Sequence, residues 1–198
     1  MTFESSKNLS AVGALLIVLG AVVGFAVDFS GVLSLVGVIL LLIGLKGLAS
    51  FYNEEGIFNN ALYSMIIAIV GCVVSVGVIA VSAVSALADI GINWANIEDW
   101  ANLGTEVGTV ITDFDFNVLL TLLGALLAGL VILFIVFIVS MYFLRKSMNQ
   151  LSTKSGIGLF GTAGILMLIG AVIPIIGLLL IWIGFIMATV AFFQMKKE

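Results

Sequence analysis

The sequence contains no histidine, one cysteine and one proline, and only 9% of its residues are charged. Zinc, haem and iron–sulfur centres are bound mainly through histidine and cysteine side chains, so no metal site and no cofactor are expected. The single cysteine, Cys72, also excludes a disulfide bond within the chain. Soluble domains carry roughly 25% charged residues. The low charged fraction therefore points away from a soluble protein.

Apolar residues make up 63% of the chain, and its mean hydropathy is +1.36. A helix needs about 20 apolar residues to cross roughly 30 Å of hydrocarbon, and apolar runs of this kind recur along the sequence. The runs are continuous rather than alternating, which favours helices over a β-barrel. We therefore expect an all-α polytopic integral membrane protein, in which residues 1–198 form a single transmembrane domain.

Six transmembrane helices are predicted, arranged as two hairpins that flank a long central pair. The acidic residues 89–117 connect the central pair, and residues 51–60 and 147–156 are predicted to be polar loops. Pro174 marks the tip of the last hairpin, where its ring favours a turn. The predicted spans are about residues 9–27, 32–49, 61–88, 118–144, 157–173 and 175–193.

The charged residues orient these spans. All seven basic residues fall on one side of the membrane, whereas the acidic segment 89–117 on the other side has none. Positively charged loops stay in the cytoplasm, so both the N- and C-termini are expected to be cytoplasmic and the acidic segment outside. The pI of about 4.6 then describes the outer face, and no nucleic-acid partner is expected. The basic residues are Lys7, Lys46, Arg145, Lys146, Lys154, Lys196 and Lys197.

The acidic segment 89–117 carries apolar and aromatic residues at helical spacings, with acidic residues on its other faces. This pattern predicts an outer interfacial helical segment with its tryptophans at headgroup level. The same pattern also fits a segment that caps a cavity or presents a binding face to a partner. The candidate outer interaction residues are Trp94, Glu98, Asp99, Trp100, Asp113 and Asp115.

Small residues recur every three or four positions along the third predicted span. In lipid, small residues allow helix backbones to approach, and serine hydroxyls can bond across helices. The stripe therefore favours a helix-packing seam, and the alternative is a polar track that lines a permeation pathway. Gly124 and Ala128 form a further small-xxx-small pair in the fourth span. The candidate packing or pathway residues are Ser64, Gly71, Ser75, Ser82 and Ser85.

Polar residues between the second and third spans form the one group that could carry acid–base chemistry. They include no nucleophile–base pair and no histidine, and they lie in a predicted exposed loop, so no enzymatic activity is expected. Apart from Lys46, the predicted spans contain no carboxylate, lysine or arginine, which disfavours proton- or cation-coupled transport. The group consists of Lys46, Tyr52, Glu54, Glu55, Asn59 and Asn60.

The run from Lys46 to Gly71 reads KGLASFYNEEGIFNNALYSMIIAIVG and follows a glycine-turn hairpin, and the closing apolar hairpin ends in AFFQMKK. With these features the chain resembles the archaeal and bacterial membrane family catalogued as domain of unknown function 996. The resemblance covers nearly the whole chain and implies a multi-pass protein of a prokaryotic, in particular archaeal, cytoplasmic membrane. That family brings no established activity, so the resemblance assigns no role to any position.

The sequence favours a non-enzymatic structural or interaction protein, surrounded by membrane lipids, that forms a homo-oligomer or assembles with a partner membrane protein. The alternative is a small channel or carrier for a neutral solute or lipid, lined by the serines of the third span. A helix seam buried in protein would support the first hypothesis. A continuous wet cavity would support the second.

Overall fold

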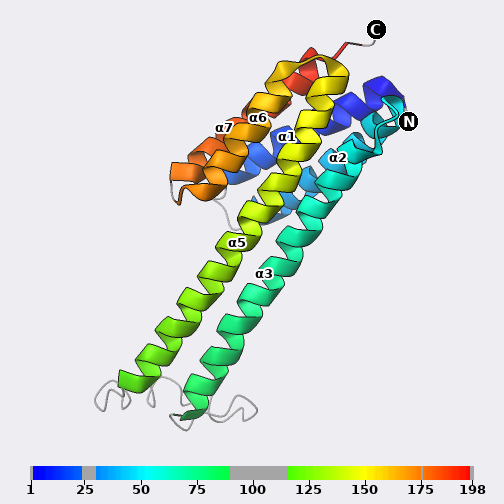
Figure 1. Ribbon diagram of the computed structural model, residues 1–198. Helices are drawn as coiled ribbons and strands as arrows, with labels where there is room; N and C mark the ends of the chain where they lie inside the picture. The colour runs from blue at the N-terminus through cyan, green and yellow to red at the C-terminus, as the bar shows by residue number, and fades with distance from the viewer. Residues whose placement is uncertain (1, 24–29, 90–115, 175, 197–198) are drawn as a thin grey trace. The chain divides into compact units, whose positions relative to one another are not determined.

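The computed structural model describes residues 2–23, 30–89, 116–174 and 176–196 (Figure 1). The regular structure within these ranges is helical and contains no strand, so the predicted all-α class is confirmed. The predicted outer interaction residues Trp94, Glu98, Asp99, Trp100, Asp113 and Asp115 lie outside the described residues. The helices are α1 (Phe3–Val23), α2 (Ser30–Phe51), α3 (Glu55–Asp89), α5 (Phe116–Ser155), α6 (Gly158–Val172) and α7 (Ile176–Gln194).

Four helices in the described part of the chain are long and apolar enough to cross a membrane. The helix α6 is also apolar, but its 15 residues at 1.5 Å each span only about 22 Å, less than the hydrocarbon thickness of roughly 30 Å. The structure therefore supports the membrane class by length and composition. The four segments are Gly31–Phe51 in α2, Glu55–Ser85 in α3, Leu119–Ser155 in α5 and Ile176–Gln194 in α7.

The chain forms two compact units. Unit 1 consists of Met1–Ala68 and Phe137–Glu198, and unit 2 consists of Ile69–Val136. Unit 1 contains α1, α2, α6 and α7, together with the first part of α3 and the last part of α5. Unit 2 contains the rest of α3 and α5, so each of these two helices belongs to both units.

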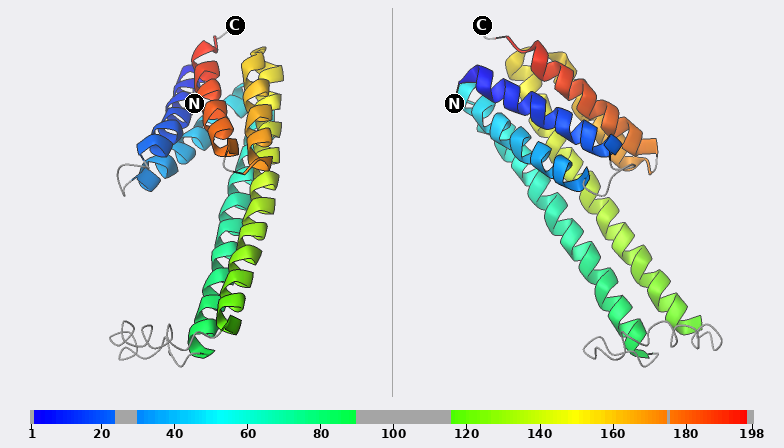
Figure 2. Two further views of the ribbon diagram at one scale, coloured as in Figure 1. Left: turned by 90° about the vertical axis from the view of Figure 1, so that its left-hand side faces the viewer. Right: turned by 180° about the vertical axis from the view of Figure 1, so that it is seen from behind.

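Close backbone contacts hold the helix pairs of unit 1 together. The helix α1 lies between α2 and α7, and α6 packs on α7 (Figure 2). A Cβ atom on Gly13 of α1 would lie 2.6 Å from the carbonyl oxygen of Gly37 in α2, and one on Gly170 of α6 would lie 2.5 Å from that of Gly177 in α7. Both distances are too short for a real side chain. Only glycine therefore allows these helices to pack at their observed separation.

The core of unit 1 takes side chains from each of the six described helices. Phe160 of α6 and Phe192 of α7 are fully buried, and their ring centroids lie 4.8 Å apart. Trp182 Nε1 of α7 donates a hydrogen bond to the Val18 carbonyl oxygen of α1 at 3.1 Å. Other fully buried large side chains are Leu45, Leu48, Ile57, Met148, Leu151, Met167 and Met195.

The predicted polar loop at 51–60 is only residues 52–54, and the predicted polar linker at 147–156 is helical as far as Ser155. The predicted extent of both loops was therefore wrong. Helix α3 begins at Glu55 rather than near Ala61, and α5 continues to Ser155 rather than ending near Leu144. These stretches are amphipathic helix ends, in which apolar or small residues enter the core and polar neighbours face outward. The buried residues of these stretches are Ile57, Asn60, Ser147, Met148 and Leu151.

Gly177→Ala is predicted to lower the free energy of unfolding by about 1–3 kcal/mol, because the new methyl group would collide with the Gly170 backbone and force α6 from α7. Gly158→Ala is the matched control, since a Cβ at Gly158 meets no described atom within 4 Å. Thermal or denaturant unfolding in mild detergent measures both changes. Equal stability of the two variants would contradict the close α6–α7 contact.

Candidate functional site

A polar network joins α3 to α5 within unit 1. Asn60 of α3 is 6% exposed, and its Nδ2 donates hydrogen bonds to the Gly56 carbonyl oxygen at 2.6 Å and to Gln150 Oε1 at 2.9 Å. Ser147 Oγ of α5 donates to the Ile57 carbonyl oxygen at 2.5 Å. Each of these buried polar side chains has a partner, as stable burial of a polar group requires. The network therefore fixes the register of α3 against α5 in this unit.

Ser64, the first residue of the predicted stripe, makes a second polar contact between the same helices. Ser140 Oγ donates to the Ser64 carbonyl oxygen at 2.9 Å, and the two Oγ atoms lie 3.0 Å apart. Because a hydroxyl has one proton, Ser64 must be the donor in the contact between the two hydroxyls. Both side chains are buried. The Ser64 hydroxyl is therefore used inside the protein, in contact with α5.

The remaining stripe residues lie in unit 2. Gly71 is buried, and a Cβ atom there would overlap the Val136 side chain of α5. Ser75 is 1% exposed, and its Oγ has no hydrogen-bond partner among the residues that the structure describes. Ser82 is half-buried, whereas Ser85 is exposed and bonds to a carbonyl of its own helix at 3.0 Å. The five candidates therefore do not share one environment.

The predicted polar group between the second and third spans is divided among separate contacts. Glu54 Oε2 lies 3.2 Å from Lys154 Nζ, with the two side chains 32% and 40% exposed. Solvent screens a pair of this kind, so it contributes only about 0–1 kcal/mol. Lys46 is not part of this pair, and its Nζ lies 5.8 Å from the centroid of the Phe58 ring. None of these contacts pairs a nucleophile with a base.

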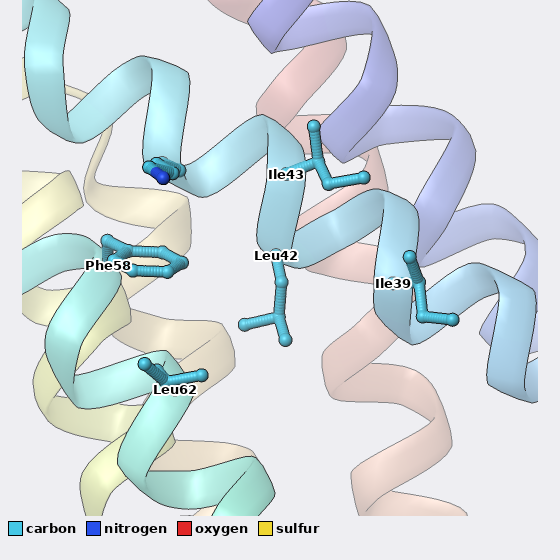
Figure 3. Close-up of a pocket in the computed structure, with 6 residues that line it drawn as sticks. Ile39, Leu42, Ile43, Phe58 and Leu62 are labelled. Carbon is cyan, nitrogen blue, oxygen red and sulfur yellow. The ribbon is translucent and has the colours of Figure 1, made fainter.

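A groove of about 220 Å³ lies between α2 and α3 in unit 1 (Figure 3). Leu42 of α2 and Phe58 and Leu62 of α3 point toward one another across it. Five of the six lining residues are apolar, and the sixth, Lys46, lines the groove through the carbon atoms of its side chain. The lining residues are Ile39, Leu42, Ile43, Lys46, Phe58 and Leu62.

Sequence reasoning did not identify the α5 partners. Ser147 and Gln150 fall in residues 147–156, which were predicted to be a loop, and Ser140 lies in the predicted fourth span, where no pattern distinguished it. A usable signal was present in their spacing. Ser140 and Ser147 are seven positions apart and therefore lie on one face of a helix. Leu144 and Leu151 follow the same interval. This repeat continues the helical pattern past Arg145 and Lys146, where the span was predicted to end.

Comparison with known proteins identifies the family. The family model described as "Protein of unknown function (DUF996)" matches residues 33–192. The chain belongs to this family. An uncharacterized protein of Methanocaldococcus jannaschii, MJ1644, is 24% identical over 200 residues, an alignment that covers 100% of this chain and 96% of the relative. No solved structure matches significantly. Neither the family description nor the name of the relative states a function.

A double-mutant cycle with Asn60→Ala and Gln150→Ala is predicted to give a coupling energy of about 1 kcal/mol, typical of hydrogen bonds between helices in lipid. The same cycle with Glu54→Ala and Lys154→Ala is the control, and its coupling should be smaller, within the range of about 0–1 kcal/mol, because solvent screens the pair. Unfolding of the four variants of each cycle in mild detergent supplies the values. A coupling for Asn60 and Gln150 no larger than that of the ion pair would contradict the assigned network.

Ser75→Ala is predicted to leave stability unchanged or to raise it by up to about 1 kcal/mol, because it removes a buried hydroxyl that lacks a partner. Ser75→Leu should lower stability by about 1–3 kcal/mol, because the site is nearly closed to solvent. Ser85→Leu, at an exposed position of the same stripe, should change it by less than about 0.5 kcal/mol. Thermal unfolding compares the three variants, and tolerance of Ser75→Leu would argue against a tight helix contact.

Proposed function

We propose that the chain is a non-enzymatic multi-pass protein of a prokaryotic cytoplasmic membrane, and that it assembles there with a second copy of itself or with another membrane protein. In this proposal the protein has six spans, α1 and α6 being the two beyond the four long apolar helices. Both termini lie in the cytoplasm, in keeping with the basic residues of the sequence. The archaeal relative supports the prokaryotic assignment.

The packing of α1 and α6 supports the six-span topology. In unit 1 these helices contact α2 and α7, which are long and apolar enough to span. Helices that pack side by side over their length share the same surroundings. The short α6 can cross if the bilayer thins locally around it, which costs only fractions of a kcal/mol per ångström of mismatch. The two helix pairs α1–α2 and α6–α7 then form the predicted flanking hairpins.

The observation that carries the assembly proposal is an unoccupied small-residue pair on α5 in unit 2. A Cβ atom on Gly124 would meet no described atom within 4 Å, and Ala128, one turn later, is exposed. Gly129 is buried instead, and a Cβ there would lie 2.6 Å from Ile79 Cγ1 of α3. The contact between α3 and α5 therefore does not use Gly124. In lipid, a small-xxx-small pair on an open helix face is typical of a contact with another helix.

The serine stripe gives less support to the transport alternative. The hydroxyl of Ser64 is committed to Ser140, and that of Ser85 to a carbonyl of its own helix. Ser75 is enclosed in contact with α5 rather than open to solvent. A permeation pathway needs polar groups that face a passing solute. These hydroxyls therefore favour a packing seam over a permeation pathway.

Gly124→Leu is predicted to dissociate the assembly, because the larger side chain would separate helices that meet at this face. Native mass spectrometry of the protein released gently from its own membranes measures this directly. The unmodified protein should appear as a defined oligomer or with a stoichiometric partner protein, and Gly124→Leu should appear mainly as a monomer.

Gly77→Leu is the matched control for this experiment. It adds the same volume to the same unit, on α3, where a Cβ also meets no described atom within 4 Å. This variant should keep the assembly. An unmodified protein that is monomeric, or an equal response of both variants, would refute an interface on the Gly124 face. A monomer that retains a small solute would instead favour transport.

A further inference from the structure

The groove between α2 and α3 has an apolar lining, and the Lys46 ammonium lies beside it, near the Phe58 ring. The chain reverses direction between Phe51, where α2 ends, and Glu55, where α3 begins. Lys46 and Phe58 lie close to this connection, and the Lys46 ammonium is 5.8 Å from the Phe58 ring centroid. Ile39 of α2 and Leu62 of α3, which also line the groove, lie farther from the connection. The groove therefore runs from a cationic end near the turn to an apolar end deeper along the helices.

Lys46 is available to an external anion. Its side chain is exposed, and among the described residues no carboxylate lies within ion-pair distance of its ammonium. The carboxylate of Glu54 is bonded to Lys154 instead. Glu55 is exposed, so solvent and salt weaken its influence. A lysine one or two turns from the end of a membrane helix reaches with its ammonium to the level of the lipid phosphates.

We propose that this groove binds an anionic phospholipid, with one hydrocarbon chain between Leu42 and Leu62 and the phosphate on Lys46. The groove has a volume of about 220 Å³. This is room for part of one hydrocarbon chain and not for a helix. The charge at the mouth selects an anionic headgroup over a zwitterionic one. The inference is independent of the assembly face on α5, because it concerns unit 1 alone.

The shape of the lining favours a lipid chain over a second protein helix. Helices that meet in lipid do so through small residues, which let the backbones approach. Apart from Lys46, this groove is lined by the large side chains of isoleucine, leucine and phenylalanine. These side chains hold an incoming helix backbone away from α2 and α3. A flexible hydrocarbon chain can follow the narrow space that they leave.

The test is native mass spectrometry of the full-length protein titrated with dioleoyl phosphatidylglycerol or with dioleoyl phosphatidylcholine, which have the same chains. The unmodified protein should retain the anionic lipid about fivefold more strongly, which corresponds to one lysine–headgroup contact. Lys46→Gln should abolish this preference. Lys146→Gln is the matched control, because Lys146 is exposed and does not line the groove, and it should preserve the preference. Leu42→Trp, which fills the groove, should reduce retention of both lipids.

A second measurement locates the lipid without changing the groove. Phosphatidylglycerol with a photoreactive diazirine in one chain should crosslink to peptides that contain residues 39–46 or 58–62. Crosslinks confined to other peptides would overturn the proposal, even if Leu42→Trp failed to fold. Equal retention of the two lipids, or equal loss of preference in Lys46→Gln and Lys146→Gln, would also overturn it. A dimer that Leu42→Trp abolishes would assign the groove to a second copy of the chain instead.

Discussion

Close approach of helix backbones is the constraint on which the described structure depends. In lipid the tails are as apolar as the side chains, so burying leucine gives little gain, and helices associate through tight packing and interhelical hydrogen bonds. Unit 1 meets this requirement with Gly13 against Gly37 and Gly170 against Gly177. The contact between α3 and α5 adds the bonds of Asn60 with Gln150 and of Ser64 with Ser140. The core that the six described helices share depends on these contacts.

The helical class and the apolar stretches could be predicted from the sequence because hydropathy acts locally. The ends of α3 and α5 could not be predicted in this way. A stretch of polar residues indicates a loop only if the residues between them are not buried in the core. Gln150 and Lys154 look like linker residues until Leu151 is seen to be fully buried in the core. Tertiary packing therefore extends both helices past the apolar segments that define them in the sequence.

The candidate site was predictable only on one of its two helices. The stripe on α3 is visible as a period, and Ser64, Gly71 and Ser75 are indeed buried. A periodic pattern on one helix does not identify the residues that it contacts on another helix. Ser140 and Gln150 could therefore be recognised as partners only in the folded structure. The groove was beyond sequence reasoning for a similar reason. Lys46 and Phe58 are twelve positions apart, and only the reversal of the chain after Phe51 brings them together.

Helix geometry separates the internal and external contacts of α5. At about 100° per residue, Gly124 and Gly129 point in directions that differ by about 140°. Because Gly129 faces α3, Gly124 cannot face it as well. Their separation in sequence, together with the position of α3, therefore places the two glycines on different faces of α5. Gly129 supplies a contact that the folded chain uses, whereas a Cβ atom on Gly124 would meet no described atom within 4 Å. Added volume at Gly124 therefore tests the proposed external contact without disturbing the contact between α3 and α5.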